Sequence, residues 1–266
     1  MTNNTPTVLI TGASSGIGAA YAARFAARGH DLVLVARNTA RLEALASDLR
    51  KDHDVEVEVL TADLADAVDL TQVADKLAQD ARIGVLVNNA GSSVAGQFAS
   101  QSPQDVAQMI ALNVTAVARL AQVAAHRFAQ SGSGAIVNIG SVIALIPELQ
   151  QTAYGATKAF VLTLSQGMSI ELKDSGVYVQ AVLPAATSTD FWERSGADVN
   201  NLPPMMTVDV LVDAAMAGFD MKETITIPVL PDAQLWEAYQ GARHAMLPHF
   251  GGVDAAPRYL SDTAAG

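Results

Sequence analysis

Short runs of aliphatic and β-branched residues alternate with longer alanine-rich stretches from residue 7 to about residue 230. Most of the short runs are apolar at consecutive positions, as in strands buried between two layers of helices. They predict strands over Thr7–Thr11, Asp31–Ala36, Val55–Leu60, Gly84–Asn88, Ala135–Ile139, Val177–Leu183 and Thr224–Pro228. The stretches between them predict helices near residues 16–28, 39–51, 66–80, 104–130, 152–174 and 207–219.

This alternation predicts an α/β fold, in which a doubly wound parallel sheet with right-handed crossovers carries helices on both faces. No linker, repeat or change of composition interrupts it, so we expect one domain over residues 1–266. Two segments depart from the pattern. Residues 185–206 predict a long irregular insertion, and residues 251–266, which are mostly small and polar, predict a loosely ordered tail.

Composition narrows the classes of partner. Half of the residues are hydrophobic, which is enough for a sizeable core, and 16 basic against 27 acidic residues give a formal net charge of −11. A surface this acidic repels phosphate backbones and anionic lipids, so we expect neither nucleic acid nor membrane as a partner. The chain has no cysteine and its five histidines are scattered, so no metal site is predicted. The amino-terminal MTNNTPT has no basic or long apolar segment, and we expect a cytoplasmic protein.

A glycine-rich turn, TGASSGIG, joins the first predicted strand to the first predicted helix. Glycines there let the backbone bend tightly and approach a ligand, while the free N–H groups of the helix attract an anion such as pyrophosphate. The alternative is an ordinary glycine-rich turn. The position of TGASSGIG in the first strand–turn–helix unit favours dinucleotide binding instead. The expected contacts come from Gly12, Ser14, Ser15, Gly16, Ile17 and Gly18.

The end of the second predicted strand is expected to meet the adenosine ribose of such a ligand. A carboxylate there marks NAD, whereas an arginine accepts the 2′-phosphate of NADP. The sequence has Arg37 and no acid, which favours NADP(H), with NAD(H) as the alternative. The other interpretation is that Arg37 stacks on the adenine or lies in solvent. Asp63 and Leu64 follow the third strand and are expected at the adenine edge, unless Asp63 only caps a helix.

Tyr154 and Lys158 lie four residues apart in a predicted helix, so both side chains point from one face. An ammonium ~5 Å from the phenol oxygen favours phenolate by about 3 kcal/mol at an effective dielectric constant of ~20. We therefore expect Lys158 to lower the pKa of Tyr154 by roughly two units, towards neutral pH. Taken alone, such a pair is more often part of a solvated helix face than a catalytic pair.

Several of these elements occur in one order along the chain. The glycine run is followed by Asn88-Asn89-Ala90-Gly91 after the fourth strand, Asn113, Ser141 after the fifth strand, and Tyr154-x-x-x-Lys158. Over about residues 7–230 the chain resembles the single-domain short-chain dehydrogenase/reductase family. The resemblance implies a seven-stranded Rossmann-type sheet, and hydride transfer between a nicotinamide cofactor and a carbonyl or alcohol.

The resemblance also implies roles for individual residues. Tyr154 matches the catalytic acid/base, and Ser141 matches the hydroxyl that holds the substrate oxygen. Lys158 matches the residue that lowers the tyrosine pKa and binds the nicotinamide ribose. Asn113 matches the helix residue that anchors a water between Lys158 and solvent. Further cofactor contacts are implied for Asn89, Ala90, Gly91, Pro184, Thr187 and Thr189.

The chain departs from the family pattern at two places. Where Pro-Gly is common after the sixth strand, this chain has Pro184-Ala185, and alanine disfavours positive φ. This departure leaves open whether Thr187 or Thr189 reaches the nicotinamide carboxamide. NADP-preferring members often have a basic residue in the glycine run, and Ser15 takes that position here. Arg37 is therefore expected to recognise the phosphate nearly alone.

The substrate is expected against Ser141 and Tyr154, beneath the insertion. The surrounding loops are apolar and favour a neutral, hydrophobic ketone, aldehyde or secondary alcohol, although the same residues could simply pack the loop shut. The predicted pocket residues are Val94, Val142, Leu145, Phe191, Trp192 and Met205. The family's equivalents of the two long helices form oligomer interfaces, so we expect a homodimer or homotetramer.

The sequence thus favours an NADPH-dependent carbonyl reductase that also oxidises the alcohol in reverse. An NAD-linked alcohol dehydrogenase is the alternative among enzymes. The alternative from another class is a dinucleotide-binding regulatory protein that has no turnover.

Overall fold

A computed structural model describes residues 5–189 and 205–260 of the chain. Contacts group the chain into two compact units, Met1–Pro228 and Val229–Gly266, where the sequence predicted one domain. The second unit contains α9 (Ala233–His244), a helix that the sequence did not predict. The helix lies beyond the last strand of the alternating pattern, and none of its residues is buried. Part of the predicted tail forms a 3-10 turn at Pro257–Tyr259, and residues 261–266 lie outside the described residues.

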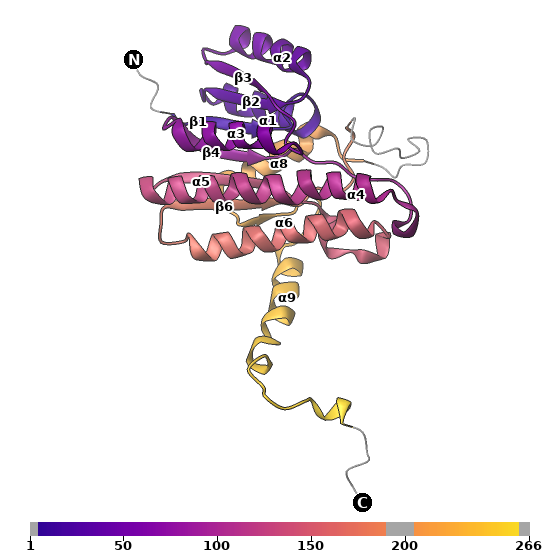
Figure 1. Ribbon diagram of the computed structural model, residues 1–266. Helices are drawn as coiled ribbons and strands as arrows, with labels where there is room; N and C mark the ends of the chain where they lie inside the picture. The colour runs from indigo at the N-terminus through magenta and orange to yellow at the C-terminus, as the bar shows by residue number, and fades with distance from the viewer. Residues whose placement is uncertain (1–4, 190–204, 261–266) are drawn as a thin grey trace, which may run out of the picture. The chain divides into compact units, whose positions relative to one another are not determined.

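The first unit is built on a parallel sheet of seven strands in the order β3-β2-β1-β4-β5-β6-β7 (Figure 1). In the pairing of β1 with β4, Thr7 is opposite Ile83 but Val8 is opposite Val85. The register therefore shifts by one residue at the start of these two strands. The strands are β1 Thr7–Thr11, β2 Leu32–Ala36, β3 Val57–Thr61, β4 Ile83–Asn88, β5 Gly134–Ile139, β6 Val177–Val182 and β7 Ile225–Thr226. The predicted fold class is confirmed, because all seven predicted strands form within a few residues of their expected bounds.

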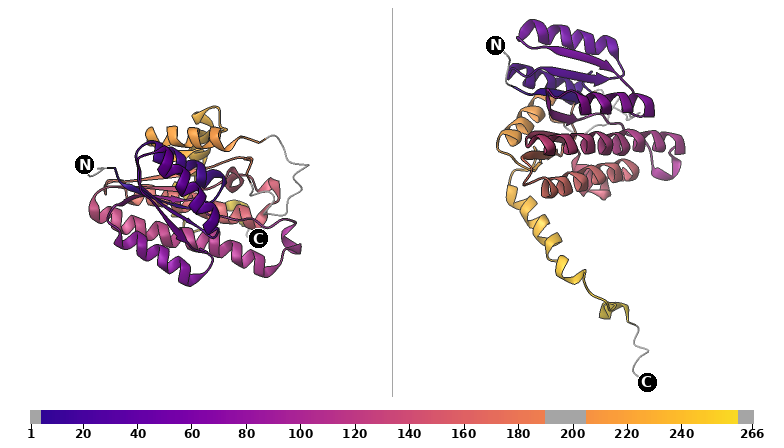
Figure 2. Two further views of the ribbon diagram at one scale, coloured as in Figure 1. Left: turned by 90° about the horizontal axis from the view of Figure 1, so that it is seen from above. Right: turned by 60° about the vertical axis from the view of Figure 1, so that its left-hand side comes forward.

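Two helical layers cover the two faces of this sheet (Figure 2). On one face lie α1 (Gly16–Ala27), α2 (Thr39–Asp52) and α8 (Val208–Asp220). The other face is covered by α3 (Ala67–Gln79), α5 (Val117–Ser131) and α6 (Thr152–Glu171). Alternate strand residues supply both cores, since successive side chains point to opposite faces. Val8 and Ile10 belong to the first core, and Leu9 belongs to the second.

The predicted helix 104–130 has three parts. It begins as α4 (Pro103–Ile110), continues as a π-helical turn at Ala111–Ala116, and ends as α5. Together they form a stretch with the length and apolar composition of a membrane span. Leu120, Ala124 and Phe128 nevertheless pack into the second core, as in the core helix of a globular domain.

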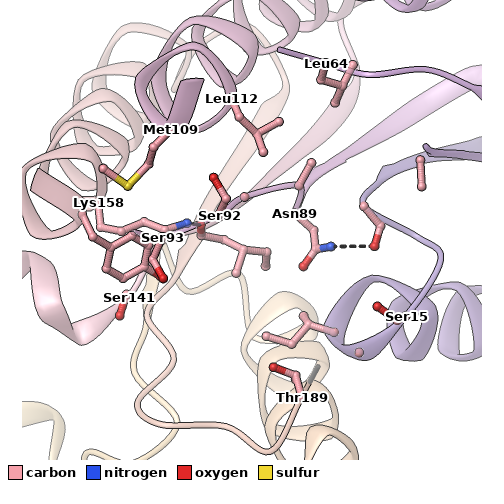
Figure 3. A pocket seen from close by; sticks show the side chains of 18 of the residues that line it. Ser15, Leu64, Asn89, Ser92, Ser93, Met109, Leu112, Ser141, Lys158 and Thr189 are labelled. Carbon is pink, nitrogen blue, oxygen red and sulfur yellow. Dashed lines mark hydrogen bonds between the residues drawn. The ribbon is translucent and has the colours of Figure 1, made fainter. Parts of the chain in front are cut away.

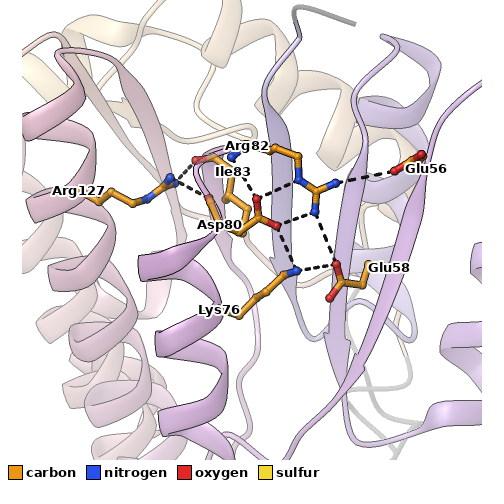
Figure 4. A network of polar contacts seen from close by, with 7 residues as sticks. All are labelled: Glu56, Glu58, Lys76, Asp80, Arg82, Ile83 and Arg127. Carbon is orange, nitrogen blue, oxygen red and sulfur yellow. Dashed lines mark hydrogen bonds and ion pairs between the residues drawn. The ribbon is translucent and has the colours of Figure 1, made fainter. Parts of the chain in front are cut away.

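The amino ends of the strands are joined by a network of charged side chains (Figure 4). Asp80, after α3, contacts Arg82 at 2.7 Å and Lys76 at 3.1 Å, and Lys76 also contacts Glu58 of β3 at 2.6 Å. Arg127 of α5 donates to the carbonyl oxygens of Asp80 and Ile83. Hydrogen bonds from Arg82 hold the pKa of Asp80 well below its usual range. This network fixes α3 and α5 against the sheet at one end, and the cavity described below lies at the other.

We expect Phe128→Ala to lower the free energy of unfolding by about 3–5 kcal/mol, because the ring is buried and its removal leaves a cavity. Phe128 is 1% exposed, and a Cβ on Gly134 would lie 2.4 Å from its ring. Urea denaturation measures the change. Phe98→Ala is the matched control, since Phe98 is 54% exposed and its loss is expected to change stability little. Equal losses in the two variants would contradict the described core.

Candidate active site

The glycine-rich turn has a backbone that requires glycine. Gly12 and Gly16 have φ values of 65° and 55°, in the left-handed region that other residues rarely adopt. A Cβ on Gly18 would lie 2.5 Å from the carbonyl oxygen of Gly12, so this position requires close approach. Helix α1 begins at Gly16, and its first turn carries no acidic residue. The turn therefore presents helical N–H groups and a positive dipole end to an anion.

Thr11 and Asn89 hold this turn against the loop after β4. The hydroxyl of Thr11 accepts the N–H groups of Asn89 and Ala90, at 2.9 and 3.0 Å. In return, the side-chain amide of Asn89 donates to the carbonyl oxygens of Thr11 and Gly12, at 2.9 and 3.2 Å. Figure 3 draws one hydrogen bond from this amide. The strand order reverses between β1 and β4, which is where ligands bind in open α/β sheets. These bonds fix the distance between the two loops at that point.

One cavity of about 1770 Å³ extends from the glycine turn to Tyr154. It contains most of the predicted site residues. Those on its wall are Gly12, Ser14, Ser15, Gly16, Ile17, Arg37, Asp63, Leu64, Asn89, Ala90, Gly91, Val94, Ser141, Val142, Tyr154, Lys158, Pro184, Thr187 and Thr189. Gly18 is not on the wall, and its tight contact with the turn explains why a glycine stands there.

The end of the cavity near β2 carries two arginines. Arg37 is 71% exposed, and its Nη1 lies 3.8 Å from Oδ2 of Asp63. An exposed pair at this distance contributes little to stability, so Arg37 can turn towards a bound anion at small cost. Arg41, in the first turn of α2, also lines the cavity. The prediction that Arg37 acts nearly alone did not consider Arg41, whose position early in α2 (Thr39–Asp52) brings it to the same end of the cavity.

The opposite end of the cavity brings Ser141, Tyr154 and Lys158 together. Ser141 follows β5, and Tyr154 and Lys158 lie in the first two turns of α6. The hydroxyl groups of Ser141 and Tyr154 are hydrogen-bonded to each other. The amine of Lys158 lies 5.7 Å from the centre of the Tyr154 ring and donates to the carbonyl oxygen of Ile139 at 2.9 Å. Figure 3 shows the labelled Ser141 and Lys158 on the same side of the cavity.

The predicted lowering of the Tyr154 pKa is wrong for the structure described. Burial of the hydroxyl raises the pKa of Tyr154 above its ordinary value of 10.0, and the hydrogen bond with Ser141 opposes this only in part. Burial also lowers the pKa of Lys158 from 10.5 to about 8. Removal of a group from water disfavours its charged form, and burial is the largest cause of the pKa shift at both residues.

Asn113 lies behind the cavity wall, within the π-helical turn, and it is 1% exposed. Its side-chain Oδ1 accepts the N–H of Ser92 at 2.9 Å, and its Nδ2 donates to the carbonyl oxygen of Ser92 at 2.8 Å. The sequence predicted that Asn113 belongs to the site, but it did not predict the two hydrogen bonds with Ser92. Its proposed contact with a water stays a prediction.

The segment after β6 also reaches the cavity. Pro184, Thr187 and Thr189 line it, and a Cβ on Gly16 would lie 3.2 Å from the methyl group of Thr189. Among the described non-glycine residues, positive φ occurs only at Gln150 and Lys222. The alanines after Pro184 therefore fit without strain.

The substrate end differs in part from the prediction. Val94 and Val142 line the cavity, whereas Leu145 and Met205 are not among its lining residues. Leu145 ends a 3-10 turn that begins at Val142, and Met205 precedes Met206, which pairs with Thr187. Phe191 and Trp192 lie outside the described residues. The lining residues that the sequence did not indicate include Ser92, Ser93, Met109, Leu112, Leu149 and Gln151.

The described residues contain no group of three or more His, Cys, Asp or Glu side chains that could hold a metal ion. The polar groups of the cavity are hydroxyls, amides, an amine, two arginines and the separate carboxylates of Asp63, Asp66 and Asp105. These groups fit the phosphates, ribose and carboxamide of a nicotinamide dinucleotide.

Comparison with known proteins gives consistent matches. A family profile described as short chain dehydrogenase matches residues 6–200. A short-chain dehydrogenase from Sphingobium yanoikuyae, solved in complex with NADPH, is 58% identical with a TM-score of 0.94, over 96% of this chain and 100% of that one. The bulky-bulky ketone specific alcohol dehydrogenase from Comamonas testosteroni is 52% identical with a TM-score of 0.91, over 97% and 100%.

A curated relative matches over a shorter region. Human 17-beta-hydroxysteroid dehydrogenase type 3 is 34% identical over 183 residues, which is 68% of this chain. The chain covers only 59% of the length of that relative.

We expect the stability of the wild type relative to Lys158→Met to rise by about 1.5 kcal/mol between pH 8 and pH 9.5. The folded chain releases the Lys158 proton near pH 8, whereas the unfolded chain holds it to about 10.5. Unfolding therefore takes up a proton in this range, and the free energy of unfolding increases with pH. Urea denaturation at a series of pH values measures it. Lys173→Met, at an exposed lysine, is the control, and parallel curves for wild type and Lys158→Met would contradict the shifted pKa.

Proposed function

Because the chain belongs to the short-chain dehydrogenase family, we propose that it is an NADPH-dependent oxidoreductase acting on neutral, hydrophobic ketones or aldehydes. The same site would oxidise the corresponding alcohols in reverse. The observation that carries this proposal is the hydrogen-bonded pair of Ser141 and Tyr154 beside Lys158, in a cavity continuous with the glycine turn. These groups lie where a carbonyl and a dinucleotide would meet.

The cavity supports a phosphorylated dinucleotide as the cofactor. The glycine turn and the start of α1 would hold the pyrophosphate, and Arg37 and Arg41 would hold a 2′-phosphate. A relative with 58% identity was solved with NADPH, which supports the same choice here. When bound, the reduced nicotinamide supplies a hydride to the carbonyl carbon.

Tyr154 would donate a proton to the carbonyl oxygen as negative charge develops there. Burial keeps its phenol protonated at neutral pH, which is the form that carbonyl reduction requires. Ser141 would donate a second hydrogen bond to the same oxygen. Lys158, with a pKa of about 8, carries its charge at neutral pH and would stabilise the phenolate that Tyr154 becomes.

The substrate end supports a hydrophobic substrate with two large groups. Its lining includes Val94, Met109, Leu112, Val142, Ile143 and Leu149. An apolar wall around a few polar groups is typical of a site for a neutral organic ligand. The relative with 52% identity is described as specific for bulky-bulky ketones, and we infer the same substrate class for this chain. The predicted cytoplasmic location and homodimer or homotetramer are further proposals.

We expect Tyr154→Phe to lower NADPH-dependent ketone reduction at least about 100-fold, because the proton donor is removed. The measurement is NADPH oxidation with a panel of ketones bearing two large substituents, alongside NADPH binding, which the variant should retain. Tyr239→Phe, at an exposed tyrosine, is the control for losing a phenol hydroxyl. A wild type that binds NADPH but reduces no ketone would favour the regulatory alternative. Full activity in Tyr154→Phe would exclude Tyr154 as the acid.

We expect Arg37→Asp to lower the ratio of kcat/KM for NADPH to that for NADH by about 10-fold or more, because a cation facing the 2′-phosphate becomes an anion. Arg41→Ala should lower the ratio in the same direction. Steady-state kinetics with both cofactors measure it, with Arg258→Asp in the second unit as the control. An unchanged ratio in both cavity variants would indicate that these arginines do not contact the phosphate.

A further inference from the structure

Thr157 has a buried hydroxyl that the proposed mechanism leaves unused. It lies in α6 directly before Lys158, and it is 3% exposed. Its Oγ1 donates to the carbonyl oxygen of Tyr154 at 2.8 Å. Oγ1 of Thr157 also accepts a hydrogen bond from Nδ2 of Asn113 at 3.1 Å. The hydroxyl therefore joins the turn that carries Tyr154 to the π-helical turn that carries Asn113.

Asn113 continues this connection to the cavity wall. Its amide bonds both the N–H and the carbonyl of Ser92, so Oδ1 and Nδ2 cannot exchange places without losing both bonds. The Nδ2 group has two hydrogens, of which one goes to Ser92 and one to Thr157. Removal of the Thr157 hydroxyl would leave a buried N–H without its acceptor, which is strongly unfavourable.

The wall segment held by Asn113 adjoins Lys158. A Cβ on Gly91 would lie 3.3 Å from Oδ1 of Asn113 and 3.6 Å from the amine of Lys158. Gly91 and Ser92 both line the cavity, and Figure 3 shows Ser92 beside Lys158. A displacement of this wall would therefore alter the surroundings of the lysine amine.

We propose that Thr157 is a positioning residue, which fixes the Gly91–Ser92 wall relative to Tyr154 and Lys158 through the amide of Asn113. It touches neither of the groups that would react, and it acts through the three bonds of that amide. The proposal rests on the proposed function for its effect on catalysis. Its effect on the backbone at Ser92 is independent of that function.

Ser165 provides a matched control on the same helix. Its Oγ donates to the carbonyl oxygen of Val161 at 2.7 Å and accepts Nδ2 of Asn138 at 3.0 Å. It is 1% exposed, so Ser165→Ala removes a buried hydroxyl with the same pattern of bonds as that of Thr157. Asn138 and Val161, however, do not line the cavity. The two hydroxyls thus differ in what they connect.

The experiment compares Thr157→Val, Thr157→Ser and Ser165→Ala in the full chain. We expect kcat for ketone reduction to fall about 10-fold or more in Thr157→Val, with little change in NADPH affinity, because reacting groups are displaced while the phosphate end is untouched. Thr157→Ser, which keeps the hydroxyl, should stay within about twofold of the wild type. Ser165→Ala should lower Tm by about as much as Thr157→Val does, but its kcat should stay within about twofold of the wild type.

Hydrogen exchange of a peptide spanning Ser92 gives a second measurement that needs no substrate. We expect the amide hydrogens of this segment to exchange faster in Thr157→Val than in the wild type or in Ser165→Ala. Equal kcat in Thr157→Val and Ser165→Ala, or equal exchange at Ser92, would overturn the proposal. If the wild type reduces no ketone, the proposed function fails, and exchange at Ser92 alone decides the role of Thr157.

Discussion

The close contact between the loops after β1 and β4 is the constraint on which the rest of the site depends. The sheet order reverses there, so neighbouring crossovers diverge and leave a cavity. Thr11, Asn89 and the glycines hold the two backbones together at its base. The loop that leaves this contact continues to Gly91 and Ser92, beside Lys158. The phosphate end and the reactive end therefore share one short support.

Burial decides the protonation of the reactive groups. It raises the pKa of Tyr154 and lowers that of Lys158, so the phenol stays protonated at neutral pH and the amine is held near the point of release. Two buried charges attract each other, but each loses its hydration first. The spacing of Tyr154 and Lys158 indicates that they meet, whereas only the fold shows how much water they lose.

The fold and most of the site could be predicted from the sequence because their signals are local. Consecutive apolar runs mark buried strands, and the glycine turn, Ser141 and the Tyr154–Lys158 pair are readable within a few residues. The missed features depend on distant partners. Thr157 matters through Asn113, 44 residues away, and apolar character alone could not show that Leu145 does not line the cavity.

The π-helical turn at Ala111–Ala116 has a geometric consequence for the helix around it. A π turn holds more residues than an α turn, so it contributes an additional residue to an otherwise continuous helix. Each residue of an α-helix rotates the following chain by about 100°. Phe128 follows Met109 by 19 residues, whereas about 18 residues make five whole α-helical turns, so a regular α-helix would set the two side chains about 100° apart. The additional residue of the π turn absorbs this rotation, so both side chains stay buried. The π turn thus keeps the buried faces of α4 and α5 in one phase while Asn113 also points inward.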